Sequence, residues 1–484
     1  MLGSGRMRRI IAGTAVAFSA AAALPLAAQA PDLSLPDMGQ PANQAMSLAE
    51  ERRLGRELMS QIRRQLPVMD DPVINDYVSD IGQRIASYSA AGRGFSFFTL
   101  QDQRINAFAM PGGFIGIHTG LLAQTESESE FASVMAHEIA HVTERHIARQ
   151  RLRSEGINLR TTAMMLAGLL AATQDPQAGQ AIIMGGAASG VQSRLNFSRE
   201  FEREADRIGL QALANAGFRP EAMASFFERL ERANRYRGSP LPYLSTHPLT
   251  EDRLSQARER AKSLERRNTF ESPEYPFVRA RVIALGGDSP GDRIARFDDE
   301  MASKGRTPAR IYGRAKALIR AGRAEEAIRP LQSLINDGEE YGVLYATLAE
   351  AYLGSDRPGE AVATLDDGLS LYPGDYALRY TRIEALLAAG KGRQALRAAD
   401  DARRDFPEDV PLLDLRAQAA EAGGNRAEQA LATADYYAAL GDLRGALRQL
   451  DRVDNAANAS TYDRSRAEAL RERWQNRLEK SRER

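Results

Sequence analysis

His137-Glu138-Ile139-Ala140-His141 places two histidines four residues apart, with a glutamate next to the first. Positions i and i+4 of a helix share one face, so both imidazoles can bind the same Zn²⁺. Glu138 is then placed to take a proton from a metal-bound water as a general base. Apolar neighbours suit a helix buried in a core: Val134, Met135, Ile139 and Val142. The pattern predicts a catalytic zinc helix, and the alternative is two core histidines beside a surface glutamate.

A catalytic zinc site needs a third protein ligand and an open position for water. The chain has five histidines and no cysteine, so this ligand is another histidine or a carboxylate. We expect His146 on a different face of the helix from His141, and His118 in a strand region where it could equally be solvated. Glu202 and Asp206 offer two carboxylates on one helical face, one as ligand and one to orient an imidazole. A solvated charged helix explains this run equally well.

The composition excludes several classes of protein. Sixty-four basic and 64 acidic residues give a formal net charge of zero, which gives no support to a nucleic-acid surface or a polybasic membrane anchor. The absence of cysteine excludes disulfides, thiolate metal sites, thiol catalysis and a lipidated N-terminal cysteine. A length of 484 residues allows roughly two to three domains.

Residues 1–30 have the layout of a secretory signal peptide. Arginines precede an Ala-rich apolar stretch from Ile10 to Leu26, and Ala28-Gln29-Ala30 is a small-x-small cleavage pattern. We expect cleavage after Ala30, and the alternative is an N-terminal membrane anchor. Residues 31–46 are predicted to be a flexible N-terminus.

No later run reaches the roughly 18 apolar residues of a membrane span, so no transmembrane segment is expected in the mature chain. The apolar stretches Thr161–Thr173 and Ala181–Val191 are too short. They are interpreted as buried helices beside the active-site cleft, or as a face that touches membrane or client proteins.

Residues 47–272 are predicted to form the metal-binding domain. Ser47 with Glu50 indicates a capping box that opens a helix. Apolar runs at 105–110 and 114–118 flank Pro111-Gly112-Gly113, which is typical of a hairpin. Residues 273–304 contain several prolines and glycines and are interpreted as a linker.

Residues 305–484 repeat with a period of 34. Ala327, Ala361 and Ala395 are spaced by 34 residues. The same spacing separates Pro373 from Pro407 and Gly390 from Gly424. This period is typical of tetratricopeptide (TPR) repeats, whose stacked helix pairs form an α-solenoid with a concave surface for a partner or substrate. A generic helical bundle is the alternative.

The two motifs together resemble the M48 metallopeptidases. His137–His141 is followed about sixty residues later by Ser198-Arg-x-x-Glu202-x-x-Ala-Asp206, as in that family. The resemblance implies that Glu202 is the third zinc ligand and that Asp206 supports it or donates a proton. It also implies a zincin-type domain, mainly α with a small β-sheet, and one Zn²⁺ per chain.

Two further features are implied by the same resemblance. In Ser245-Thr246-His247-Pro248, His247 would be an inhibitory fourth zinc ligand on a movable loop, although it could also be an ordinary turn residue. Arg253 follows this segment and could stabilise the tetrahedral oxyanion.

The same resemblance also implies an edge strand beside the zinc cleft, to which an extended substrate could pair. Its residues are Asn106, Ala107, Phe108, Ala109 and Met110. The alternative is a small sheet that simply packs on the active-site helix.

The combination of signal peptide, M48 domain and TPR repeats implies a zinc-dependent endopeptidase of the bacterial periplasm. By resemblance, its expected role is quality control or assembly of outer-membrane proteins. Misfolded or stalled outer-membrane proteins, and the barrel-assembly machinery, are the expected partners of the repeats. The rival hypothesis is a chaperone or assembly adaptor with a latent or structural zinc site.

Overall fold

The structure is a computed structural model that describes residue 42 and residues 46–89, 94–153, 199–235, 241–264, 269–287, 289–339, 341–457 and 459–482. The predicted signal peptide, nearly all of residues 31–46 and the two apolar stretches between 161 and 191 lie outside these residues. Among the described helices, none combines the length and apolar character that crossing a membrane requires.

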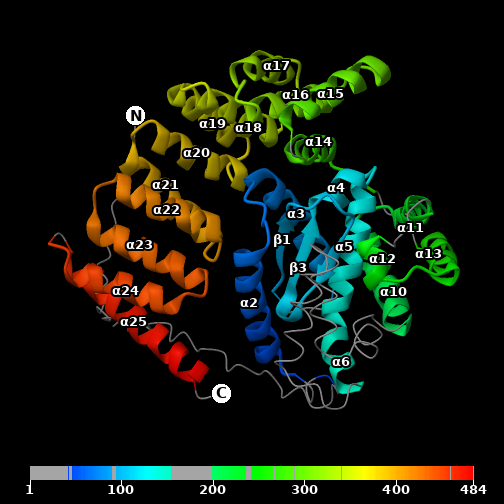
Figure 1. Cartoon of the computed structure of the whole chain (residues 1–484), viewed down its shortest axis with the longest axis horizontal. Coiled ribbons are helices and arrows are strands. Elements are labelled where there is room, and N and C mark those ends of the chain that lie inside the picture. Colours follow the sequence, from blue (N-terminus) through cyan, green and yellow to red (C-terminus); the bar gives the residue numbers. More distant parts are fainter. Residues whose placement is uncertain are drawn as a thin grey trace, which may run out of the picture. The chain divides into compact units, whose positions relative to one another are not determined.

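The described part of the chain is mainly helical, with one small sheet (Figure 1). Its first half contains α2 (Leu48–Gln65), α3 (Pro72–Ala86), β1 (Ser96–Leu100), β2 (Ala107–Ala109), the 3₁₀ turn η1 (Pro111–Gly113), β3 (Phe114–His118), α4 (Thr119–Gln124), α5 (Glu128–Thr143), α6 (His146–Arg153), α10 (Arg199–Asn215), α11 (Glu221–Asn234), α12 (Pro242–Thr246) and α13 (Glu251–Ser263). Its second half contains α14 (Tyr275–Leu285), α15 (Pro290–Lys304), α16 (Pro308–Arg320), α17 (Glu325–Asn336), α18 (Gly342–Gly354), α19 (Pro358–Leu371), α20 (Tyr376–Ala388), α21 (Gly392–Asp405), α22 (Val410–Ala422), α23 (Arg426–Ala439), α24 (Leu443–Asp454) and α25 (Thr461–Arg482).

The sheet has the strand order β1-β3-β2, so β2 is an edge strand. β1 and β3 are parallel, whereas β2 and β3 form the predicted antiparallel hairpin. Gly112 and Gly113 turn the chain at φ 80° and 88°, a region that glycine enters without steric penalty. The Phe108 ring lies over Gly116, where a Cβ would come within 2.4 Å of it.

α5 is the central helix of the metal-binding domain. All of its residues are buried, and it packs against α3, α10, α11 and β2. Ser127 caps its N-terminus by accepting a hydrogen bond from the Glu130 N–H. Gly209 lets α10 approach closely, because a Cβ there would lie 2.9 Å from the Ala136 carbonyl oxygen. α5 and α10 can therefore present ligands to a common point.

The expected N-terminal helix is present as α2. Ser47 and Glu50 form the predicted capping box, with each side chain bonded to the other's backbone N–H.

Residues 273–304, interpreted from the sequence as a linker, form the helices α14 and α15. Tyr275 and Phe277 are buried in the main core. Pro276 and Pro290 stand in the first turns of these helices, where the missing N–H has no helical partner to lose. The domain boundaries themselves remain predictions.

Residues beyond 305 form successive helices in which each packs against the next. Ala327, Ala361 and Ala395, which mark the 34-residue period, are fully buried. Gly390 and Gly424 both have positive φ just after a helix, at 70° and 77°. The predicted fold class, a mainly helical chain with a small sheet and TPR-like repeats, is confirmed.

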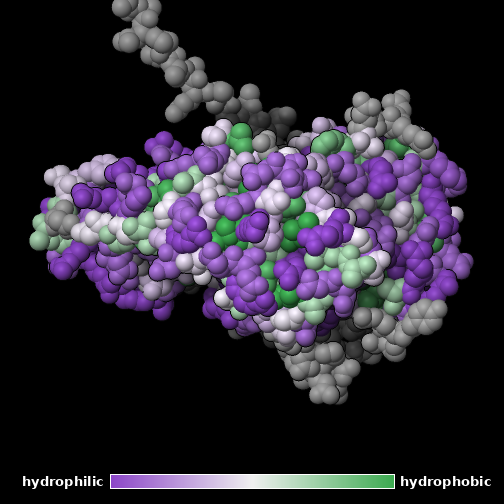
Figure 2. All heavy atoms as spheres, turned by 90° about the horizontal axis from the view of Figure 1, so that it is seen from above, coloured by the Kyte–Doolittle hydropathy of each residue, from purple (hydrophilic) through white to green (hydrophobic). Residues whose placement is uncertain are grey.

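The two halves are joined by buried contacts. α3 packs against α20, and the Ser60 hydroxyl of α2 donates to the Leu440 carbonyl at 3.0 Å. Arg281 of α14 is fully buried and pairs with Asp71 at the start of α3 and with Glu350 of α18. The face drawn in Figure 2 is mostly hydrophilic, with apolar residues in small separate patches.

Candidate metal centre

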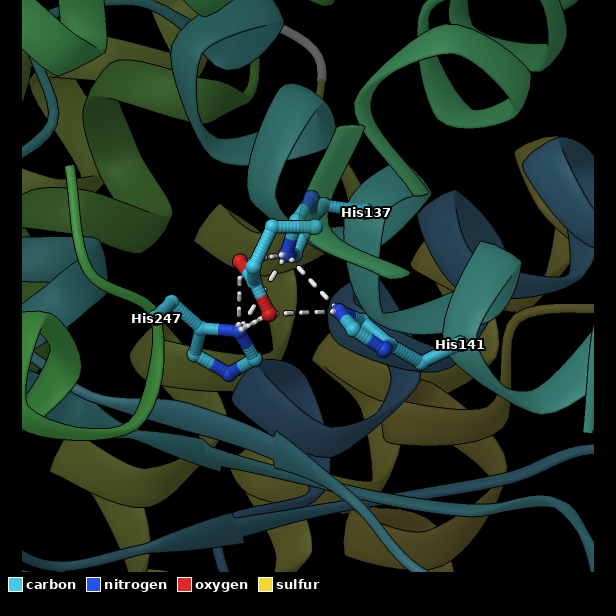
Figure 3. Close-up of side chains that lie close together, drawn as sticks. His137, His141 and His247 are labelled. Carbon is cyan, nitrogen blue, oxygen red and sulfur yellow. Dashed lines mark hydrogen bonds and ion pairs between the residues drawn. The ribbon is translucent and has the colours of Figure 1, made fainter. Parts of the chain in front are cut away.

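Four side chains from three parts of the chain meet in a buried cluster. His137 and His141 come from α5 and Glu202 comes from α10, whereas His247 directly follows α12. One ligand atom from each lies within 4.8 Å of all the others, and all four side chains are buried. Figure 3 shows the three imidazoles turned towards one another.

Most of the distances between these groups are close to those around a tetrahedral zinc ion. His137 Nε2 lies 3.0 Å from His141 Nε2 and 3.3 Å from His247 Nδ1. The Glu202 carboxylate lies 3.4 Å from His137 Nε2, 3.5 Å from His141 Nε2 and 3.1 Å from His247 Nδ1. Zinc bonds of about 2.0–2.1 Å at tetrahedral angles separate ligand atoms by about 3.3 Å. The donor set and its spacing therefore fit Zn²⁺.

Asp206 and Arg253 surround the predicted ligands. Asp206 lies 2.9 Å from Nδ1 of His137, the nitrogen that faces away from the cluster. Arg253 donates to both Asp206 oxygens at 2.7 and 2.8 Å and pairs with Glu202 at 2.9 Å. The structure thus places Asp206 where it can orient His137, and it places Arg253 against two carboxylates.

The electrostatics of the cluster favour ionised carboxylates beside His137. Burial favours protonation of Glu202, but the histidines, His247 first, hold its pKa well below the usual range. Burial lowers the pKa of His137, yet hydrogen bonds from its ring to Asp206 and Glu202 outweigh burial and raise this pKa to about 9. The ionised carboxylates of Glu202 and Asp206 thus favour a positive charge on the His137 ring, and a bound divalent cation would take the place of that proton.

Glu138 is fully buried, and burial raises the pKa of its carboxyl group. Among the described residues, neither of its oxygens has a hydrogen-bond partner of good geometry. The His247 ring lies close to it, with Nε2 3.5 Å from Oε1. The carboxylate is therefore poised to accept a proton.

His247 is a member of the cluster in this structure, not a solvated turn residue. It is 1% exposed, and its N–H donates to the Tyr243 carbonyl at 2.8 Å. The Tyr243 ring lies against the imidazole, with centroids 4.8 Å apart. Its two nitrogens face Glu202 and Glu138 respectively.

The edge-strand residues are placed beside α5, with β2 packed on that helix. Asn106 and Met110 flank β2, and their backbone groups bond to β3, through the His118 N–H at 3.1 Å and the Phe114 carbonyl at 2.8 Å. Because bonding groups alternate along an antiparallel strand, the N–H and C=O of Ala107 and Ala109 face the open edge.

Two histidines differ from expectation. His118 is fully buried in β3 beside Asp102, at 3.3 Å, and is not part of the cluster. His146 is not on α5, which ends at Thr143. Its Nδ1 lies 2.9 Å from Nδ1 of His141, and burial lowers its pKa to about 4.

The misplacement of His146 has a local cause. Arg145 turns the chain at φ 55°, a left-handed conformation that usually requires glycine or asparagine. No glycine signalled the end of α5, so the sequence pattern did not reveal the break.

Family models match two parts of the chain, one around the metal cluster and one among the helical repeats. Residues 72–261 match the family model of peptidase family M48, and residues 352–419 match that of the tetratricopeptide repeat. A beta-barrel assembly-enhancing protease of Escherichia coli (strain K12) is 35% identical over 342 residues, 70% of each chain. A Vibrio cholerae relative is 38% identical over 323 residues, 66% of each chain. The mitochondrial metalloendopeptidase OMA1 of Schizosaccharomyces pombe is 32% identical over 222 residues, 44% of this chain and 62% of that one.

Proposed function

Because this chain belongs to peptidase family M48 and is a metalloendopeptidase, we propose that it is a zinc-dependent endopeptidase of the periplasm that acts in the quality control or assembly of outer-membrane proteins. The name of the Escherichia coli relative supports the outer-membrane role. The signal-peptide pattern of residues 1–30 supports export with cleavage after Ala30. Residues 47–272 would form the peptidase domain and residues 305–484 the repeats, connected by 273–304.

The observation that carries this proposal is the four-ligand cluster. His137, His141 and Glu202 would hold one Zn²⁺ per chain, and His247 would fill the fourth position. A catalytic zinc needs that position open for water. The arrangement therefore fits a latent enzyme in which His247 must leave before a peptide is cut.

Each residue around the cluster then has a chemical role. Bound zinc would polarise the scissile carbonyl and lower the pKa of water. Glu138 accepts a proton from the attacking water and passes it to the leaving amine. Asp206 holds the His137 ring in orientation, and Arg253 is close enough to the cluster to offset charge that develops on the oxyanion.

Substrate binding would use β2. The N–H and C=O groups that Ala107 and Ala109 direct to the open edge offer main-chain hydrogen bonds to an extended peptide, with little sequence preference. The repeats would hold misfolded or stalled outer-membrane proteins, or dock on the barrel-assembly machinery.

A chaperone or assembly adaptor with a latent zinc site is the second candidate, and the closed position of His247 favours it. The two differ in what Glu138 does. An enzyme loses turnover on Glu138→Gln while keeping its zinc, whereas an adaptor keeps its cellular role.

The test measures zinc content of the mature protein and cleavage of an unfolded protein by wild type, Glu138→Gln and His247→Ala. We expect one zinc in all three, no cleavage by Glu138→Gln and faster cleavage by His247→Ala. Zinc without cleavage by any variant supports the adaptor. Absence of zinc from the wild type contradicts the site.

A further inference from the structure

A second chain of hydrogen bonds leads away from the cluster on the side of His141. Nδ1 of His141 lies 2.9 Å from Nδ1 of His146, and Nε2 of His146 lies 3.1 Å from the Glu204 carboxylate. The His146 ring is fully buried. This series of hydrogen bonds thus links Nδ1 of a ligand imidazole to a carboxylate of α10.

Neighbouring side chains hold His146 and Glu204 in place. The His146 ring stacks on Phe201, with centroids 4.5 Å apart and planes inclined by 14°. Arg149 lies over the Phe201 ring at 4.8 Å and donates to Glu204 at 2.8 Å. These contacts fix both the plane of the imidazole and its acceptor.

The backbone before His146 is held in a conformation that is costly for its residue. Arg145 has φ 55°, and its buried guanidinium donates to Glu51 and to the Met46 carbonyl. A left-handed non-glycine residue is disfavoured by about 1–3 kcal/mol and persists where surrounding contacts impose it. The turn that brings His146 back to His141 is therefore supported from α2.

The positions of the protons follow from the acceptors. An ionised Glu204 only accepts, so Nε2 of His146 carries a proton and donates it. In a neutral ring, Nδ1 of His146 then accepts the proton of His141 Nδ1. This leaves a lone pair on Nε2 of His141, the atom that faces the ligand cluster.

We propose that His146 and Glu204 are positioning residues that fix the tautomer and ring orientation of His141 for the metal. The proposal deepens the zinc site proposed above. Each histidine of α5 would then be oriented by a carboxylate of α10: His137 directly by Asp206, and His141 through His146 by Glu204. Loss of such outer partners typically weakens metal binding by about 10–100-fold.

A matched pair of substitutions at His146 tests this relay from His141 through His146 to Glu204. Asparagine places an amide near the position of Nδ1, where it can still accept from His141, but it cannot reach Glu204. Glutamine places its amide near Nε2 and keeps the bond to Glu204, but removes the acceptor for His141. Both remove the stacked ring, so a role limited to packing would affect them alike.

Zinc affinity of the full-length apoprotein, measured by competition with a chromophoric chelator, is the first readout. We expect His146→Gln to bind zinc about 10–100-fold more weakly than wild type, and His146→Asn to lie within a few-fold of it. Glu204→Ala should weaken binding less than His146→Gln. Glu200→Gln, which removes an exposed carboxylate one turn earlier on α10, is the control and should bind as wild type.

The visible spectrum of the Co²⁺-substituted protein is the second readout, because it reports ligand geometry independently of turnover. We expect the bands of His146→Gln to shift and those of His146→Asn to match wild type. Equal zinc affinities and spectra for both variants would overturn the relay while leaving the zinc site intact. A wild type without zinc would instead contradict the proposed function itself.

Discussion

Arg253 carries a buried positive charge held between the carboxylates of Asp206 and Glu202. Removing one partner of a buried ion pair leaves the other unpaired in a site that solvates charge poorly. Arg253 is therefore as important for the stability of the apoprotein as for any role towards substrate.

We expect Arg253→Met to lower the free energy of unfolding of the apoprotein by about 3–5 kcal/mol, measured in urea. Zinc should restore part of this loss, because the cation compensates the same carboxylates. Arg253→Lys, which retains the charge, should lose less. If Arg253→Met leaves apoprotein stability unchanged and lowers only kcat, the residue acts on the oxyanion alone.

At this scale the sequence singled out the residues that the structure brings together in the cluster, and the reason differs between them. The spacing of His137 and His141 follows from the helix, the spacing of Glu202 and Asp206 made them candidates, and the resemblance to a family implied their separate roles. His146 was misplaced because its position depends on the conformation of Arg145, for which the side-chain type gives no signal.

The edge strand β2 is an element whose function depends on which backbone groups it leaves unpaired. Phe108 lies opposite Gly116 in the ladder with β3, so Ala107 and Ala109 present their N–H and C=O groups to the open edge. A proline at an outward-facing position removes only the outward N–H.

We therefore expect Ala107→Pro to lower the rate of peptide cleavage at least about tenfold while the zinc content and melting temperature stay near those of wild type. Phe108→Pro is the matched control, because it removes an N–H directed at β3 and should destabilise the domain. Full activity of Ala107→Pro would show that substrates do not pair with this edge.

The segment between residues 273 and 304 shows what a pattern of prolines and glycines leaves open. Prolines and glycines between residues 273 and 304 suggested a linker, yet Pro276 and Pro290 each lie in the first turn of a helix. Proline favours that position as strongly as it favours loops. Burial of Tyr275 and Phe277 distinguishes a packed helix from a loop here, and this burial depends on the tertiary fold.

At the scale of the whole molecule, the contact between α3 and α20 gathers acidic groups. Burial, together with the charges of Asp80 and Asp375, raises the pKa of Asp76 to about 8. Burial and the same neighbours raise the pKa of Glu274 to about 7. These side chains come from α3, from the residue before α14 and from the residue before α20.

These acidic groups should lower the free energy of unfolding as the pH rises. An unfolded aspartate loses its proton near pH 4, whereas Asp76 keeps its proton to about 8, so the folded state binds more protons between these values. We expect the melting temperature of Asp76→Asn to change less between pH 5 and 8 than that of wild type. At pH 8 the variant should be more stable than wild type by at least about 1 kcal/mol. Asp401→Asn, at an exposed position of α21, should leave the profile unchanged.

Arg281 connects the two halves of the molecule through a single buried guanidinium. It donates to Asp71, which caps α3, at 2.7 Å, and to Thr347 of α18 at 2.9 Å, and it pairs with Glu350. Asp71 belongs to the predicted peptidase domain and Glu350 to the repeats. Helical repeats are otherwise stabilised mainly by their nearest neighbours, so such a link can make the two halves unfold together.

We expect Arg281→Met to lower the unfolding free energy by about 3–5 kcal/mol and to split one calorimetric transition into two, of which only the peptidase transition shifts with zinc. Arg416→Met is the matched control. Arg416 is also a buried arginine, but its partners Asp400 and Glu428 lie within the repeats. Its loss should destabilise the repeats by a similar amount without severing them from the peptidase domain. The same number of transitions in both variants would mean that the coupling between the halves does not depend on Arg281.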